Sequence, residues 1–404
     1  MAEQTGARVL GRRLRLGMVG GGKAGSIGAV HRIAARLDDH YELVAGALSA
    51  DPARAKAFAA ELYIPPDRAY DDFVTMAHTE AGRDDGIDVV AIVTPNHLHH
   101  SAAKAFLQAG IHVICDKPMT NTVEDALDLV ALVRQTGLVF CLTHNYTGYP
   151  MVRQARAMIK AGDIGTVRVV QVDYPQCALS LRLEDTARQQ ALWRNDPAQA
   201  GPGGCVGDIG SHAFNLASYV TGLELEELCA DLSAFVPGSR LDDNAHILLR
   251  YKGGARGMLW SSKVAVGDEN ALKIRVYGDL GGLQWEQEQP NHLHFSPLGE
   301  AVRLITRAGA QSGAAAAWVS RVPAGHPEGY LEGFASLYSD VAEVIGARLE
   351  GRNPSPLATR FPSVEDGART IKFITAAALS SSQGGTWVNT ELSLCDKKEK
   401  RNER

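Results

Sequence analysis

The chain has 404 residues, of which 45% are hydrophobic and 22% charged, and its formal net charge is −5. Single domains run to roughly 100–200 residues, so this length excludes one ordinary core and fits two domains. The near balance of charge excludes the strongly basic surface of a nucleic-acid-binding protein, and no apolar window approaches the ~18 residues of a membrane span. We therefore expect a cytoplasmic protein without a nucleic-acid or membrane partner.

Short apolar runs alternate with longer helix-like segments from Leu14 to about Asn145. The runs LRLGMVG at 14–20, DVVAIVTP at 88–95 and HVICDKP at 112–118 are each followed by a segment with helical periodicity. Strands that alternate with helices form a parallel sheet, and apolar strands indicate that helices cover both of its faces. The sequence predicts an α/β fold with an N-terminal extension at 1–13 and a doubly wound, dinucleotide-binding Rossmann domain at 14–146.

The pattern changes after Pro150, where strands follow one another without intervening helices. HILLRYKGGARGMLWSS at 246–262 predicts two strands around a Gly-Gly turn, and further strands are expected near LKIRVYG, GGLQWEQ and HLHFSPL. Helices are predicted from about Asp208 to Val220 and near 329–349 and 364–381. We expect an α+β substrate-binding and oligomerisation domain at 147–390, with a large, mostly antiparallel open sheet. The charged segment at 391–404 is expected to be a disordered tail.

The six cysteines carry no metal or disulfide signature. None lies at a C-x-x-C spacing from another: Cys115, Cys141, Cys177, Cys205, Cys229 and Cys395. Scattered cysteines predict reduced thiols, and we expect neither a metal site nor a disulfide framework.

A glycine-rich sequence, GGGKAG, follows the first predicted strand. Gly20, Gly22 and Gly25 satisfy G-x-G-x-x-G, in which the glycines allow a tight turn, close approach of a pyrophosphate and close packing of helix on strand. The position between a strand and a helix favours dinucleotide binding, and the alternative is a turn without a ligand. Lys23, inside the loop, contacts the cofactor, the substrate or only solvent.

The choice between NAD and NADP depends on the end of the second strand. An acidic residue there usually receives the ribose 2′-hydroxyl of NAD, but this chain has Ser49, with Arg54 five residues later. Arg54 could meet the 2′-phosphate of NADP. The alternative is that Arg54 is solvated and Asp51 only caps a helix, so both cofactors stay open.

Two further features carry candidate proton chemistry. Lys117 ends an apolar strand and precedes Pro118, at the edge of the sheet where ligands bind in open α/β folds. In GGCVGDIGSHAFN at 203–215, Asp208 and His212 are four residues apart and share one face of a helix. Alone, the lysine is an ordinary surface charge and the pair is a surface ion pair or a helix cap.

In combination, these motifs resemble the glucose-fructose oxidoreductase, inositol dehydrogenase and rhizopine-catabolism family, Gfo/Idh/MocA. The resemblance covers about residues 14–390 and rests on the glycine motif, Thr94-Pro95-Asn96 with His99, Asp116-Lys117-Pro118, and Asp208 with His212. In the family the residue before the lysine is usually Glu, so the shorter Asp116 is expected to keep a supporting role with altered reach.

The resemblance implies a metal-free dehydrogenase in which His212 is the base, Lys117 orients the substrate or shares its proton, and Asp208 binds substrate and tunes both. The implied cofactor-binding residues are Gly20, Gly22, Lys23, Gly25, Ser49, Arg54, Thr94, Asn96, His97, His99, Asp116 and Lys117. The implied substrate-binding residues are Lys117, Tyr146, Trp193, Arg194, Asp208, His212 and His326. Each of the substrate residues has a plain structural alternative, such as a core position for Trp193.

We expect an NAD(P)-dependent oxidation of a secondary hydroxyl in a sugar, glycoside or cyclic polyol, by a homodimer or homotetramer joined through the second sheet. One alternative is an NAD-dependent glycosidase that oxidises its substrate transiently, eliminates the aglycone, adds water and returns the hydride. The other is a cofactor-binding sensor on the same fold, because fold alone does not fix function.

Overall fold

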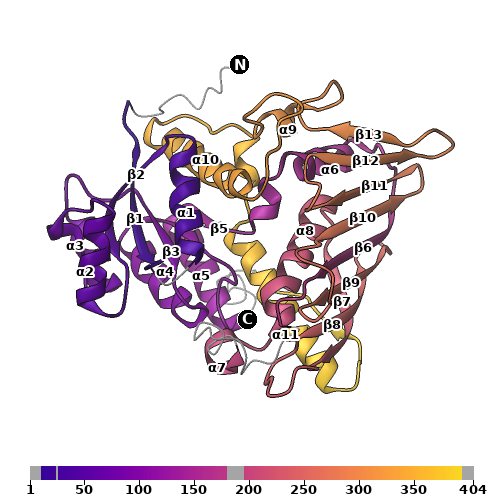
Figure 1. The fold of residues 1–404 in the computed structure, drawn as a ribbon, viewed down its shortest axis with the longest axis horizontal. Helices are drawn as coiled ribbons and strands as arrows, with labels where there is room; N and C mark the ends of the chain where they lie inside the picture. The colour runs from indigo at the N-terminus through magenta and orange to yellow at the C-terminus, as the bar shows by residue number, and fades with distance from the viewer. Residues whose placement is uncertain (1–10, 24–25, 180–194, 394–404) are drawn as a thin grey trace, which may run out of the picture.

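The computed structural model describes residues 11–23, 26–179 and 195–393, which form two sheets with helices between and around them (Figure 1). The first sheet has five parallel strands in the order β2-β1-β3-β4-β5. Its strands are β1 (Leu14–Gly20), β2 (Tyr41–Ala47), β3 (Val89–Val93), β4 (His112–Cys115) and β5 (Phe140–Leu142). Its connecting helices are α1 (Ser26–Leu37), α2 (Pro52–Glu61), α3 (Phe73–Ala81), α4 (His99–Gln108) and α5 (Val123–Thr136). The predicted doubly wound sheet is confirmed.

The second sheet has nine strands in the order β13-β12-β11-β10-β6-β9-β8-β7-β14, and all pairs are antiparallel except β6 with β9. The strands are β6 (Val167–Pro175), β7 (Leu225–Ser233), β8 (Asn244–Tyr251), β9 (Arg256–Ser262), β10 (Lys273–Gly278), β11 (Gly281–Glu286), β12 (His292–Pro297), β13 (Arg303–Thr306) and β14 (Val388–Asn389). The predicted hairpin is β8 and β9, and its turn holds Gly253 and Gly254 at positive φ. The expected large, mostly antiparallel sheet is thus present.

Helices of the second half lie on only one side of this sheet (Figure 1). They are α6 (Pro150–Ala161), α7 (Pro197–Ala200), α8 (Ser211–Thr221), α9 (Ala314–Ala317), α10 (Tyr330–Leu349) and α11 (Val364–Ser382), among which α7 and α10 also contact the first half of the chain. Among the described residues, no helix combines the length and the apolar character that crossing a membrane would require.

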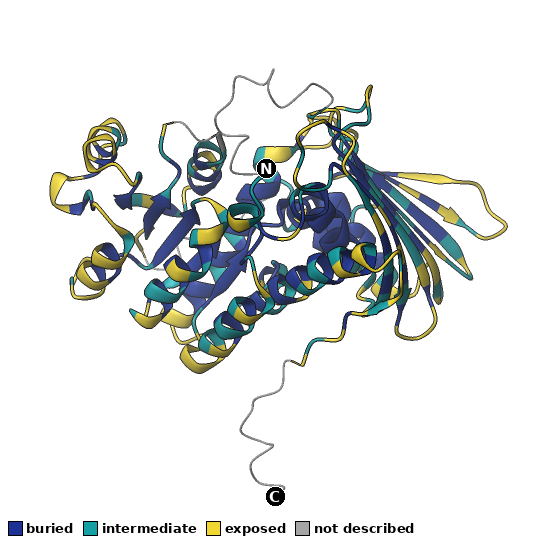
Figure 2. Cartoon of the chain, turned by 90° about the horizontal axis from the view of Figure 1, so that it is seen from below, coloured by how far each residue is buried: buried dark blue, intermediate teal, exposed yellow. Residues whose placement is uncertain are grey.

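Helix α10 packs on the first sheet, although its residues fall in the range predicted for the second domain. Phe334, Tyr338 and Val341 are buried in one cluster with Leu16 of β1 and Ala35 of α1. The strands of the first sheet are therefore buried between helices whose outer surfaces are exposed (Figure 2). Sequence order alone does not show this, because every strand of the second sheet except β14 lies between the first sheet and α10 in the chain.

The glycine loop is held against α1 by contact between two backbones. A Cβ atom at Gly28 in α1 would lie 2.4 Å from the Cα of Gly21, which has a φ of +67°. Gly28 therefore allows the close helix–strand packing that the sequence analysis had assigned to Gly25, which lies outside the described residues. No sequence rule used above singled out Gly28.

We predict that Gly28→Ala lowers the free energy of unfolding by about 1–3 kcal/mol, because overpacking forces the backbone of the loop away from α1. Denaturant unfolding would measure the loss. Gly82→Ala is the matched control, since the nearest atom to its added Cβ, the carbonyl oxygen of Thr79, lies at an ordinary 3.7 Å. Equal stability of the two variants would contradict the packing argument.

Candidate active site

The end of β4 brings Lys117 to the helix that carries Asp208. The ammonium of Lys117 donates to Oδ1 of Asp208 at 2.6 Å and to the backbone carbonyl oxygen of the same residue, also at 2.6 Å. The lysine side chain is 15% exposed and the aspartate 34%, so the pair is partly buried rather than on an open surface. This contact joins the two halves of the chain at one point, as the sequence predicted.

A second lysine, which the sequence analysis did not identify, completes the cluster. Lys263 directly follows β9, and its ammonium donates to Oδ2 of Asp208 at 2.7 Å. Each carboxylate oxygen of Asp208 therefore faces its own lysine. The sequence gives little warning of Lys263, because the parallel pairing of β9 with β6 joins strands that are far apart in the chain.

Asp208 does not lie in the regular helix that was predicted to begin near it. Residues Val206–Gly210 form a π-helical turn, and α8 begins only at Ser211. The start of this turn is fixed by Asp242, whose carboxylate accepts from the backbone N–H groups of Gly204 and Val206 at 2.6 and 2.7 Å. A π-turn is wider than an α-turn, and such turns occur frequently at functional sites. The i, i+4 spacing of a regular α-helix therefore does not determine where the side chains of Asp208 and His212 point.

His212 is buried in α8 and faces a second histidine. Its Nδ1 lies 3.3 Å from Nδ1 of His144, and His212 is only 8% exposed. Burial, then the positive charge of Lys117, then His144 hold the pKa of His212 well below its usual value. Burial and Lys117 likewise lower the pKa of His144, to about 3. Both rings are therefore neutral at neutral pH.

Two tyrosines and an amide surround His212. The rings of Tyr146 and Tyr174 meet the His212 ring edge-on, with centroids 5.0 and 6.4 Å away. The two tyrosine hydroxyls hydrogen-bond to each other, and that of Tyr174 also donates to Oδ1 of Asn270 at 2.8 Å. Tyr146 is thus brought to the cluster as expected, while Tyr174 and Asn270 were not identified from the sequence.

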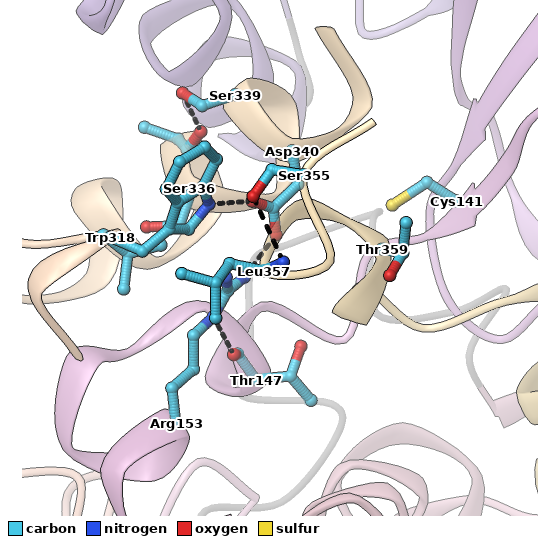
Figure 3. A network of polar contacts seen from close by, with 12 residues as sticks. Cys141, Thr147, Arg153, Trp318, Ser336, Ser339, Asp340, Ser355, Leu357 and Thr359 are labelled. Carbon is cyan, nitrogen blue, oxygen red and sulfur yellow. Dashed lines mark hydrogen bonds and ion pairs between the residues drawn. The ribbon is translucent and has the colours of Figure 1, made fainter. Parts of the chain in front are cut away.

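The turn that carries His144 and Tyr146 is supported from behind by a buried ion pair (Figure 3). Arg153 of α6 lies 2.5 Å from Oδ2 of Asp340 in α10, and its Nε donates to the carbonyl oxygen of Thr147 at 3.1 Å. Trp318 donates to the other oxygen of Asp340 at 2.8 Å. The hydroxyl of Thr147 in turn donates to the carbonyl oxygen of His144 at 2.9 Å. A buried pair of this kind strongly destabilises the fold when one partner is removed.

Asp116 keeps a supporting role, directed at the first sheet. Its Oδ1 accepts from the hydroxyl of Thr143 at 2.8 Å and lies 3.8 Å from Nε2 of the buried His31. Burial acts to raise the pKa of Asp116, but interactions with His31 and the charge of Lys117 outweigh it and hold that pKa below its usual range. Asp116 is therefore an anion that steadies the strand end beside Lys117.

The residues of the predicted Thr94-Pro95-Asn96 loop, with His97 and His99, make different contacts. The ring nitrogens of the buried His99 lie 2.7 Å from the carbonyl oxygen of Pro118 and 2.9 Å from that of Thr94. The His99 ring thus lies between two strand ends and donates to one of these oxygens, while its role in cofactor binding stays a prediction. Asn96 donates to the carbonyl oxygen of Ala200 in the second half of the chain at 3.2 Å, and His97 is exposed.

The glycine loop has the features that a dinucleotide requires. It follows β1, from which the chain adds β2 on one side and then β3 on the other. This reversal of strand order is the switch point at which such sheets bind ligands. A Cβ atom at Gly22 would lie 2.7 Å from the carbonyl oxygen of Leu48, so the loop backbone packs tightly against the end of β2. The first turn of α1 carries no acidic residue, which leaves its backbone N–H groups favourable to a phosphate. These residues fit a dinucleotide.

Three further residues that the sequence predicts to bind the cofactor, Lys23, Ser49 and Arg54, lie near this loop. Lys23 pairs with Glu61 at 2.8 Å. Asp51 caps α2 by accepting from the backbone N–H of Arg54 at 3.0 Å, and its carboxylate lies 3.6 Å from the guanidinium of the same arginine. The capping role considered for Asp51 is therefore present. Arg54 is 83% exposed, and Ser49 accepts from the backbone N–H of Asp51 at 3.1 Å.

Three predicted substrate residues and the prediction of no metal site concern other parts of the chain. Trp193 and Arg194 lie outside the described residues. His326 is exposed on the loop before α10, where its carbonyl oxygen accepts from Arg307 at 2.5 Å. Within the described ranges, no group of three or more His, Cys, Asp or Glu side chains is arranged to hold a metal ion.

Comparison with known proteins matches both halves of the chain to one family. Residues 14–146 match the oxidoreductase family with an NAD-binding Rossmann fold, and residues 152–284 match the GFO/IDH/MocA C-terminal domain. The chain is 35% identical over 390 residues to the uncharacterized oxidoreductase YfiI of Bacillus subtilis (strain 168), a match that covers 95% of this chain and 98% of the relative.

Two solved structures are similar over nearly the whole chain. The crystal structure of an oxidoreductase from Sinorhizobium meliloti is 54% identical with a TM-score of 0.84, and the match covers 93% of this chain and 99% of that one. An inositol dehydrogenase homolog from Azotobacter vinelandii, complexed with NADH and myo-inositol, is 35% identical with a TM-score of 0.86. That match covers 95% of this chain and 98% of the relative.

We predict that the protein loses stability as the pH falls below about 6.5, the usual pKa of histidine. Because the folded-state pKa values of His144 and His212 are lowered, the unfolded chain binds protons there that the folded chain does not. Each buried ring then costs up to about 1.36 kcal/mol per pH unit. Denaturant unfolding between pH 7.5 and 5 should show a shallower loss in His144→Gln than in the wild type. An unchanged slope in that variant, with the exposed His78→Gln as control, would contradict the assignment.

Proposed function

Because the chain belongs to the Gfo/Idh/MocA family of NAD(P)-dependent oxidoreductases, we propose that it oxidises a secondary hydroxyl of a sugar or cyclic polyol. The observation that carries the proposal is the joining of Lys117, Asp208 and Lys263 beside a neutral His212. The related structure with NADH and myo-inositol supports a polyol as the substrate class.

The loop at Gly20–Gly22 and the first turn of α1 would hold the dinucleotide, and Ser49 and Arg54 would bind its ribose. Asn96, at the end of β3, and Lys117, at the end of β4, lie on the same edge of the sheet. When bound, the nicotinamide accepts a hydride from the substrate carbon that bears the hydroxyl.

The hydroxyl proton passes to His212. Its ring is neutral, because burial and nearby positive charge lower its pKa, and a neutral imidazole can accept a proton. To act as a base through Nε2, His212 must carry its hydrogen on Nδ1, where it donates to Nδ1 of His144. His144 then carries its own hydrogen on Nε2, a buried nitrogen with no protein partner among the described residues.

Lys117 orients the substrate oxygen. Two of the three ammonium hydrogens are used by Asp208, and the third is the donor that remains for the hydroxyl. Its positive charge stabilises the alkoxide that develops as the proton leaves. Asp208 in turn fixes the position of the ammonium, and Lys263 fixes Asp208.

A polyol fits the remaining surroundings. The hydroxyls of Tyr146 and Tyr174 and the amide of Asn270 can read substrate hydroxyls, while the tyrosine rings cover C–H groups.

We also propose that the outer face of the second sheet joins two or more copies of the chain. Helices cover only the inner face, and Leu248, Val169 and Tyr277 are 50%, 40% and 43% exposed on the outer one. An apolar patch on an open sheet is typical of an interaction surface. A measured mass of a single chain in solution would refute this.

The function is tested by incubating the protein with NAD or NADP and a panel of inositols, free sugars and glycosides, while absorbance at 340 nm and products are followed. Reduced cofactor equal in amount to ketone product is the expected result. Release of an aglycone without accumulation of reduced cofactor would instead identify the glycosidase reaction. Cofactor binding without turnover of any substrate would support a sensor.

We predict that His212→Asn lowers kcat by about 10²–10⁴-fold, the usual contribution of a general base. NAD(P) affinity, measured by calorimetry, should stay nearly unchanged, because His212 lies in α8 rather than beside the glycine loop. His78→Asn on the exposed surface of α3 is the control and should retain full activity. Full activity in His212→Asn would refute the role of this histidine.

We predict that Lys263→Met lowers kcat by about tenfold to a hundredfold, because a hydrogen bond to a charged group contributes about 1.5–3 kcal/mol. Since Lys263 acts through Asp208, the double variant with Asp208→Asn should lose less than the product of the two single losses. Lys273→Met is the matched control, because Lys273 pairs with Glu286 at 3.4 Å elsewhere on the same sheet. Additive losses in the double variant would show that Lys263 acts independently.

A further inference from the structure

Three positively charged side chains surround a hollow that does not include Lys117, Asp208 or Lys263. The hollow lies between α6 and the short helix Ala358–Arg360, has a volume of about 330 Å³, and is lined by Arg156, Ala157, Lys160, Ala161 and Arg360. Three of its five lining residues are therefore cations. Such a concentration of like charge attracts anions.

No carboxylate of the described residues pairs with these cations. Arg156 lies 4.6 Å over the ring of Tyr219 and donates to the backbone carbonyl oxygen of that residue, but it forms no ion pair in this part of the chain. Lys160 and Arg360 likewise have no acidic partner within the described ranges. The interaction of Arg156 with the end of α8 uses one of its five N–H donors.

A second hollow, of about 480 Å³, shares Arg156 and Arg360 with the first. Two acidic residues line it, but both are already neutralised. Glu224 pairs with Lys252 at 3.1 Å, and Asp366 lies 3.2 Å from Arg369. The positive charge at the junction of the two hollows is therefore not balanced from the second hollow.

Buried polar groups without partners also line the second hollow. Asn215 is only 5% exposed, and its Oδ1 has no hydrogen-bond partner among the described residues. The buried hydroxyl of Tyr219 also lacks one. Unpaired buried polar groups are costly, and native structures usually satisfy them with water or a ligand. These unpaired atoms are an observation independent of the three cations, and they belong to residues that line the larger hollow.

We propose that this double hollow binds a phosphate monoester of a small polar molecule. The phosphate group lies between Arg156, Lys160 and Arg360, because planar guanidinium groups bind phosphate oxygens in pairs and a lysine adds a point charge. The polar remainder of the ligand extends into the larger hollow beside Asn215 and Tyr219. The site is separate from the proposed catalytic one, since Tyr219 lies at the opposite end of α8 from His212.

The test titrates the protein with inorganic phosphate, a hexose 6-phosphate and the unphosphorylated hexose, by calorimetry with NADH at saturation. Saturating NADH prevents phosphate from binding to the glycine loop, and the reduced cofactor cannot oxidise the hexoses. We expect both phosphates to bind, the ester more tightly. Failure of both phosphates to bind at millimolar concentrations would overturn the proposal, and equal affinities would overturn the assignment of the larger hollow.

Variants locate the binding. Arg360→Gln and Lys160→Gln should each weaken binding of the ester about tenfold or more, as expected for loss of a charged contact. Lys160 is exposed, so its variant tests the site without risk to the fold. Arg36→Gln, on the exposed surface of α1, is the matched control for lost charge. If all three variants bind equally well, the anion binds elsewhere and the proposal is wrong.

Discussion

The carboxylate of Asp208, held between Lys117 and Lys263, is the interaction on which the arrangement of the candidate site depends. One lysine ends a strand of the first sheet, and the other follows a strand of the second. The carboxylate therefore fixes the two sheets relative to each other at the point where the proposed reaction takes place. Two cations around one anion leave a net positive charge, which suits a site where a hydroxyl must lose its proton.

Burial and, after it, the charge of Lys117 set the protonation state of the neighbouring histidines. His144 and His212 are buried among aromatic rings, and Lys117 adds to the burial that lowers the pKa of both. A lysine that stays charged and a histidine that stays neutral divide the proposed roles between them. The first stabilises developing negative charge and the second receives the proton. Such a division of roles through environment is a recurrent way to run acid–base chemistry near pH 7.

Buried charges away from the cleft keep this arrangement in place. Asp242 fixes the π-turn that aims Asp208, and the pair of Arg153 and Asp340 supports the turn that carries His144 and Tyr146. Neither set is needed for the chemistry itself. Both reduce the freedom of groups that must keep their positions to within fractions of an ångström.

The sequence by itself determined the fold class, the family and the location of the central residues. Alternating apolar runs predict the parallel sheet, and a lysine at the end of a parallel strand points to the ligand edge, because all such ends lie together. The same rule could have found His144, which follows β5. The family match confirms the resemblance built on the glycine, lysine and Asp208–His212 motifs.

Only the tertiary structure decided the rest of the site, for reasons that lie outside local patterns. Lys263 and Tyr174 come from the ends of β9 and β6, the one parallel pair in a sheet that is otherwise antiparallel, and Asn270 comes from the loop before β10. Because these elements are far apart in the chain, chain order does not show that their side chains meet. The π-turn at Val206–Gly210 depends on a carboxylate from residue 242, and α10 joins the first sheet although nearly all of the second sheet precedes it in the chain. Residue types and periodicity fix which elements form, whereas contacts between residues far apart in the chain fix where their side chains point.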